Sequence, residues 1–127
     1  MFQNLDLFKT AISMARHSGL KQAITSQNVA NADTPGYRAK SVTPFEDLVP
    51  RTTDAFTLRT TRPSHVGPYT QFGHVTAEAR TQSDPNGNSV NLETEILNSV
   101  DAKRGHDRAL AIYRASLGIL RSALSKQ

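Results

Sequence analysis

The chain has 127 residues, a formal net charge of +4 and no cysteine, so it has room for one ordinary domain and cannot form a disulfide or a thiolate metal site. Its Lys and Arg residues are spread along the whole chain, form no basic patch and are not interleaved with aromatic side chains, which argues against a nucleic-acid partner. No apolar run approaches the ~20 residues that span a bilayer, and the N-terminus has no apolar leader with a small-residue cleavage site. We expect neither a transmembrane segment nor a cleaved signal peptide.

The first predicted element is an amphipathic helix over residues 5–32. Apolar side chains recur there mostly every three or four residues, and no proline interrupts them. Ser18 and Gly19 lie at its centre, where the glycine either weakens the helix by up to ~1 kcal/mol relative to alanine or lets another helix approach closely. The apolar stripe is a predicted assembly interface and includes Phe8, Ile12, Ala15 and Ile24.

Residues 33–89 form a polar centre that contains all six prolines and many threonines. This composition excludes a helix and predicts an irregular segment, which needs neighbours to order it. It leaves room for short β-strands at Ala55–Thr60 and His74–Ala79, where apolar and polar side chains alternate.

The last predicted element is a helix over residues 91–125, with Asn91 as the N-cap and acidic side chains in the first turn. The charged stretch 103–108 interrupts its apolar stripe, so that the helix has a weak point for bending near Gly105. Apolar side chains step by three and four residues along a heptad seam, which needs a partner. The predicted interface on this helix comprises Leu92, Ile96, Val100, Leu110, Tyr113, Leu117, Leu120 and Leu124.

The fold class is therefore predicted to be mainly α, with two long terminal helices that pack in the manner of a coiled coil and an irregular Pro/Thr-rich connection. With so few apolar residues in the centre, we expect neither helix to cover its own stripe, so that other chains cover them and the isolated chain is largely disordered at both ends. The alternative is a soluble helical-hairpin binding module or adaptor, in which the two stripes pack together within one chain.

The most specific pattern is the run Asn-Val-Ala-Asn-Ala-Asp-Thr-Pro-Gly-Tyr at residues 28–37. Its chemistry is that of a helix stop, because asparagine side chains can bond terminal carbonyls and Pro-Gly has the residue order of a type II turn. The tyrosine adds an anchor with an apolar ring and a hydroxyl group. The motif residues are Asn28, Asn31, Ala32, Asp33, Thr34, Pro35, Gly36 and Tyr37.

This run resembles the N-terminal signature of the flagellar rod and hook proteins, and its Ala-Asp form is most similar to proximal rod proteins. The segments 61–66 and 87–95 resemble the same family. The resemblance implies a single rod-type subunit over residues 1–127, whose helices pack into concentric layers of a tube in the periplasmic rod of the basal body. Implied partners are other copies, other rod proteins and the proteins at the junction of MS-ring and export gate. It also implies export by the flagellar secretion apparatus without signal cleavage.

Three weaker patterns are better explained by plain structural roles than by a functional site. Residues 84–95 place oxygen side chains at several positions of a calcium loop, but Ser89 stands where that loop needs glycine. Ser18 and Lys21 have the spacing of one hydrolase class without its companion motifs. The histidines show no metal-ligand spacing. We expect no catalytic, cofactor or metal site and no enzyme activity.

Overall fold

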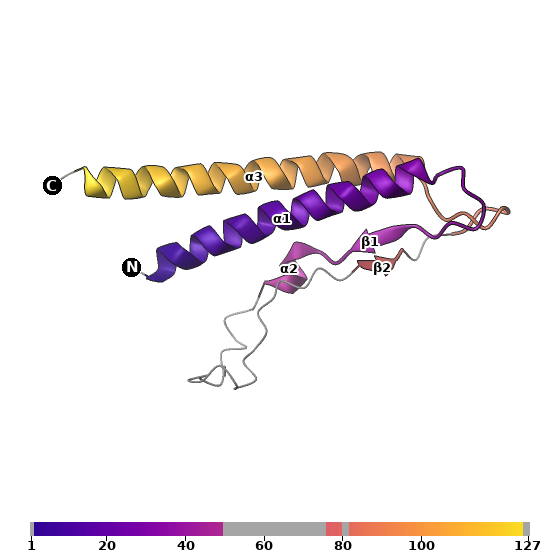
Figure 1. The fold of residues 1–127 in the computed structure, drawn as a ribbon, viewed down its shortest axis with the longest axis horizontal. Coiled ribbons are helices and arrows are strands. Elements are labelled where there is room, and N and C mark those ends of the chain that lie inside the picture. Colours follow the sequence, from indigo (N-terminus) through magenta and orange to yellow (C-terminus); the bar gives the residue numbers. More distant parts are fainter. Residues whose placement is uncertain (1, 50–75, 80–81, 126–127) are drawn as a thin grey trace, which may run out of the picture.

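A computed structural model describes residues 2–49, 76–79 and 82–125 of the chain. The elements follow in the order α1 (Phe2–Ala30), β1 (Lys40–Val42), α2 (Phe45–Leu48), β2 (Thr76–Glu78) and α3 (Leu92–Leu124). The two long helices lie side by side with both chain termini at one end, and the short elements lie along α1 on the side away from α3 (Figure 1). The predicted fold class is confirmed.

The helices α1 and α3 run antiparallel and meet along a line of small side chains. On α3 the buried positions are spaced by seven residues, at Glu95, Ala102, Ala109 and Ser116. On α1 the buried Ala11, Ser18 and Thr25 repeat the same spacing. Small residues at heptad spacing let two helix backbones approach closely while keeping the coiled-coil register. The helices approach closely at Gly105, where an added Cβ would lie 2.7 Å from the Ser18 Oγ.

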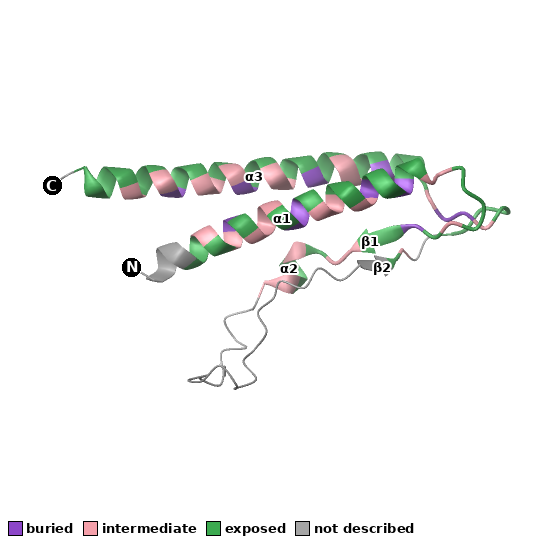
Figure 2. Cartoon of the chain, viewed as in Figure 1, coloured by how far each residue is buried: buried purple, intermediate pink, exposed green. Residues whose placement is uncertain are grey.

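The predicted seam of α3 lies beside this line of small residues, and its members from Leu110 to Leu120 are half-buried, whereas Leu124 is exposed. The ring of Tyr113 meets that of Phe8 edge to face, with centroids 5.3 Å apart. The expectation that neither helix could cover its own stripe is therefore wrong in part, because α1 and α3 partly cover each other. Large apolar side chains nevertheless remain exposed on both helices (Figure 2), namely Leu7, Ile12, Val29, Leu92, Ile96, Leu97, Val100, Ile119 and Leu124.

The helix ends fall close to the predicted ones. The first helix spans 2–30 instead of 5–32, and the last begins after the predicted N-cap, where the Asn91 side chain accepts a hydrogen bond from the Thr94 N–H. The predicted weak point at Gly105 lies within α3, which continues as one helix to Leu124, in agreement with the predicted extent. Because Gly105 packs on Ser18, it serves the contact between the helices.

The central segment contributes a two-stranded antiparallel ladder in which Lys40 pairs with Glu78 and Val42 with Thr76. The strand β2 lies within the predicted 74–79 stretch, whereas β1 was not predicted, and the strand expected at 55–60 lies outside the described residues. The exclusion of helix from residues 33–89 is wrong at α2. Pro44 precedes that short helix as its N-cap, a position where proline does not disturb helical hydrogen bonds.

The first part of the central segment, around Thr43 and Phe45, is fixed to α1 through His17. Its Nε2 lies 2.7 Å from the Thr43 carbonyl oxygen, and its ring packs against Phe45 with centroids 5.5 Å apart.

Neither α1 nor any other helix in the described ranges has the length and apolar character needed to cross a bilayer.

Candidate assembly site

The motif at residues 28–37 forms the exit from α1 and a tight turn. The Tyr37 N–H donates to the Thr34 carbonyl (3.3 Å), and Gly36 has φ +72°, which matches the predicted type II turn. The Asn31 side chain donates to the Gln27 carbonyl (2.8 Å), so the predicted bonding of a terminal carbonyl by Asn31 is confirmed.

Asn28 has a different role from the predicted one. Its side chain is fully buried and donates to the Lys40 carbonyl (2.8 Å) and to the Glu95 Oε1 (3.1 Å). Its Oδ1 accepts from the Lys40 N–H (3.0 Å) and the Tyr37 hydroxyl (3.3 Å). All four hydrogen-bonding positions of this amide are thus occupied, and it ties α1 to both β1 and α3.

A second buried asparagine, Asn88, binds carbonyls of the turn that follows α1, and it was missed as a functional candidate. Its buried Nδ2 lies within hydrogen-bonding distance of the carbonyls of Asn31 (2.9 Å), Ala32 (2.6 Å) and Thr34 (2.9 Å). Its Oδ1 accepts from the Val90 N–H (2.8 Å). The turn after α1 is therefore held by a residue more than fifty positions away in the chain, which local pattern rules do not search.

Backbone contacts close the junction between these two segments. The Gly36 N–H donates to the Asn86 carbonyl (3.1 Å), and the Ser89 N–H donates to the Tyr37 carbonyl (3.1 Å). Gly87 has φ +81°, and a Cβ there would lie 3.3 Å from the Gly36 Cα, so glycine is required for both conformation and space. We call residues 28–40 together with 84–95 the helix junction.

The motif residues divide into a buried part and an exposed part. Asn28 is buried, and Asn31, Ala32 and Tyr37 are half-buried, so these residues hold the junction together. The residues of the turn, Asp33 to Gly36, are exposed.

The predicted interface residues divide in the same way. Phe8, Ala15 and Ile24 of α1 and Leu110, Tyr113, Leu117 and Leu120 of α3 are half-buried. Ile12, Leu92, Ile96, Val100 and Leu124 are exposed. Leu97, exposed by 67%, joins the first half of this α3 surface and was not predicted, because it lies off the three-four stripe. We call Leu92, Ile96, Leu97 and Val100 the α3 apolar patch.

Comparison with known proteins agrees with this arrangement. The family model of the flagella basal body rod protein matches residues 17–38, from the histidine that anchors the central segment to the end of the motif turn. The flagellar basal body rod protein FlgB of Agrobacterium fabrum is 30% identical over 118 residues, which cover 89% of this chain and 88% of that protein. At this coverage the similarity includes the junction and most of the two long helices. The chain belongs to the flagellar basal body rod protein family and is of the FlgB type.

Proposed function

We propose that this chain is a subunit of the proximal flagellar rod, which assembles through α1 and α3 into the axial tube. The observation that carries the proposal is the α3 apolar patch, whose members are exposed by between 43% and 67%. Soluble monomers rarely leave several large apolar side chains exposed side by side, and such patches usually mark contacts with other proteins.

The finer parts of the proposal follow from family membership. The tube would transmit motor torque, conduct exported subunits and be required for motility. Its partners would be other copies, other rod proteins and the proteins where the MS-ring meets the export gate. The subunit would reach the periplasmic rod through the flagellar secretion apparatus, without signal cleavage.

The helix junction supports such a role because it sets the geometry between the two helices and the central segment. Asn28 and Asn88 join parts of the chain that are far apart in sequence, and no bound group is needed to hold them. A subunit of a regular tube needs this kind of fixed shape, since small changes in angle accumulate over many copies.

A helical-hairpin adaptor is the second candidate, and the intramolecular contact of α1 with α3 favours it. The two hypotheses differ in what the α3 apolar patch contacts. A rod subunit buries it in a polymer of many copies, whereas an adaptor keeps it free for a single partner.

The test is a strain that lacks this gene and carries either wild-type or Ile96→Asp protein. The wild-type gene should restore swimming and rods in purified basal bodies, whereas the variant should restore neither, because a carboxylate cannot be buried among apolar neighbours. Ala115→Asp places the same charge on an exposed position in the second half of α3 and should leave swimming unchanged. Normal motility of the deletion strain would rule out the proposed function.

A further inference from the structure

One side of the α1 and α3 pair carries three hollows in a row. Their volumes are about 240, 280 and 420 Å³. The first is lined by Ile12 and Leu110, the second by Gly19 and Lys103, and the third by Ser26 and Ile96. Each step is seven residues on both helices, which corresponds to about 10.5 Å along a helix axis. We call this row the helix groove.

The heptad spacing of the hollows follows from the small residues that bring α1 and α3 together. In coiled coils, side chains of one helix insert into holes formed by neighbouring helices, and the holes repeat every seven residues. Two closely packed helices therefore present a row of holes that a third helix can fill with side chains at positions i, i+7 and i+14.

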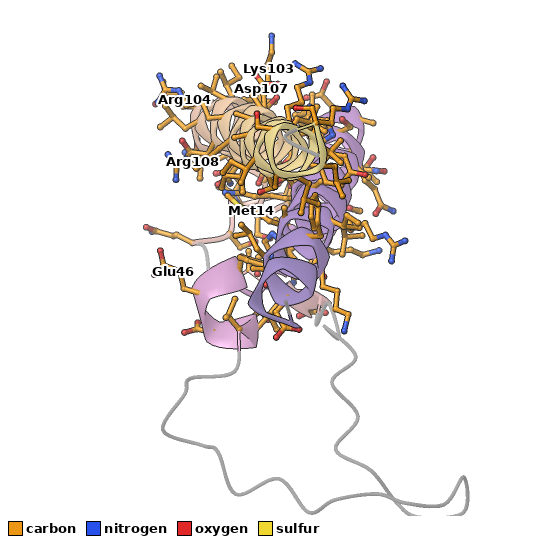
Figure 3. The ribbon with its side chains drawn as sticks, turned by 90° about the vertical axis from the view of Figure 1, so that its left-hand side faces the viewer. Met14, Glu46, Lys103, Arg104, Asp107 and Arg108 are labelled. Carbon is orange, nitrogen blue, oxygen red and sulfur yellow. The ribbon has the colours of Figure 1, made fainter. Side chains whose placement is uncertain are left out.

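The groove lies away from the described part of the central segment that contacts α1. On α1, His17 and Asn28 contact Thr43 and Lys40, whereas Gly19 and Ser26 line the groove. On α3, Arg104 and Arg108 lie on the same side of the molecule as α2 and its Glu46, with Met14 of α1 between the helices (Figure 3). The charged stretch 103–108 is thus spread around α3, and Lys103 and His106 line the middle hollow.

No contact or backbone angle in the described part of the chain requires a glycine at position 19. A Cβ built on it meets no atom within 4 Å, and its φ is not in the left-handed region. A glycine inside a helix destabilises it by roughly 0.5–1 kcal/mol relative to alanine. From the sequence, the close approach of another helix was one explanation for Gly19. In the structure α3 approaches α1 at Ser18 and Gly105 instead. No described residue fills the space above Gly19, which is therefore open to a neighbouring chain.

The lining of the hollows specifies the chemistry of that occupant. The first and third hollows are bordered by large apolar side chains such as Tyr113 and Val29. The middle hollow has Gln22 and Ser99 hydrogen-bonded to each other across it (3.0 Å), and Lys103 forms no ion pair with any described residue. A carboxylate in the middle hollow would pair with this ammonium group.

We propose that the helix groove receives an amphipathic helix of a neighbouring rod subunit, which inserts two apolar side chains and, between them, one carboxylate at seven-residue spacing. Gly19 is the point of closest approach. The single polar position fixes the register of the third helix, as one polar core position does in coiled coils. This inference rests on the proposed rod function and names the surface that a neighbour occupies.

The experiment compares Gly19→Leu with Gly118→Leu in the deletion strain. Both glycines lie inside a long helix and have open space at Cβ, but only Gly19 lines the groove. Circular dichroism of the purified proteins should show at least the wild-type helical content for both, because leucine favours helix more than glycine does. The Gly19→Leu strain should lose rods and swimming to the level of the deletion strain, while the Gly118→Leu strain swims as wild type. Swimming of the Gly19→Leu strain, or equal loss in both strains, would overturn the proposal.

A second comparison addresses the carboxylate. Lys103→Glu should lose rod assembly, whereas Lys103→Arg, which keeps the positive charge, should retain it. Normal assembly of the Lys103→Glu protein would remove the carboxylate from the proposal. Failure of the rod function itself is a different result, because the wild-type gene would then make no difference to swimming.

Discussion

At the scale of single residues, the helix junction depends on two asparagines because an amide can donate and accept at once. Asn28 uses its two donors and two acceptor positions on three different segments. Asn88 lies near three carbonyls of the turn that follows α1 and thereby fixes that turn to the segment before α3. Ionised aspartate has the same shape but no donor, so it could not make the hydrogen bonds that asparagine donates at these two positions.

Asn88→Ala should lower the free energy of unfolding by about 1–3 kcal/mol, because buried carbonyls lose their donor. Urea unfolding followed by circular dichroism measures this. Asn88→Asp should destabilise at least as much at pH 7, because its carboxylate would face three carbonyl oxygens. In that variant the fold raises the pKa of the new carboxyl above its unfolded value of about 3.9, since only the protonated form donates. Its contribution is therefore lost as pH rises through the folded pKa and is fully present below about pH 4.

At the scale of the elements, the contact of α1 with α3 is set by small residues and not by the leucines. The buried side chains at heptad spacing are alanine, serine or threonine at six positions, and Gly105 adds one more site of close approach. The leucines of the seam lie along the edge of this contact. Each of Leu110, Leu117 and Leu120 is partly covered by the chain itself and partly exposed.

Gly105→Ala tests the close approach. The added Cβ would lie 2.7 Å from the Ser18 Oγ but 3.7 Å from the Ser18 Cβ, an ordinary contact. In the wild-type background the gain in helix propensity should be offset by crowding against the hydroxyl group. In a Ser18→Ala background the same change should stabilise by up to ~1 kcal/mol, the usual difference between glycine and alanine in a helix. A double-mutant cycle of unfolding free energies measures the coupling, and additive effects would show that the helices are farther apart.

The sequence predicted the two helices, their ends to within a few residues, the Asn91 cap and the turn at Gly36, since each depends on local chemistry. It did not predict that the small-residue line would form the contact. An analysis of hydrophobic periodicity gives most weight to large side chains. The seven-residue repeat of Ala102, Ala109 and Ser116 is nevertheless visible in the sequence. The partner of Asn28 on β1 and the contacts of Asn88 with the turn after α1 could not be predicted, because they require knowing which distant segments meet.

At the scale of the whole molecule, the described part of the chain has a very small core. Its buried apolar side chains are all alanines, at Ala11, Ala39, Ala102 and Ala109. Burial of apolar surface yields roughly 25 cal/mol per Å², and alanine offers little surface. The ordering of two long helices must overcome their conformational entropy with this small gain. The large apolar residues that could supply more remain exposed until another chain covers them.

The stability of the helices should therefore depend on concentration and on assembly. Purified protein should lose helical circular dichroism on dilution, and its midpoint of thermal unfolding should rise with concentration, because association stabilises only the folded state. Leu117→Ala provides the matched comparison. Leu117 is half-buried in the single chain, so its truncation there should cost well below the ~2–5 kcal/mol typical of a fully buried leucine, and assembled rods should show the larger effect. A helical signal that is independent of concentration, with a full-sized Leu117→Ala effect in dilute monomer, would mean that the hairpin is complete by itself and would favour the adaptor.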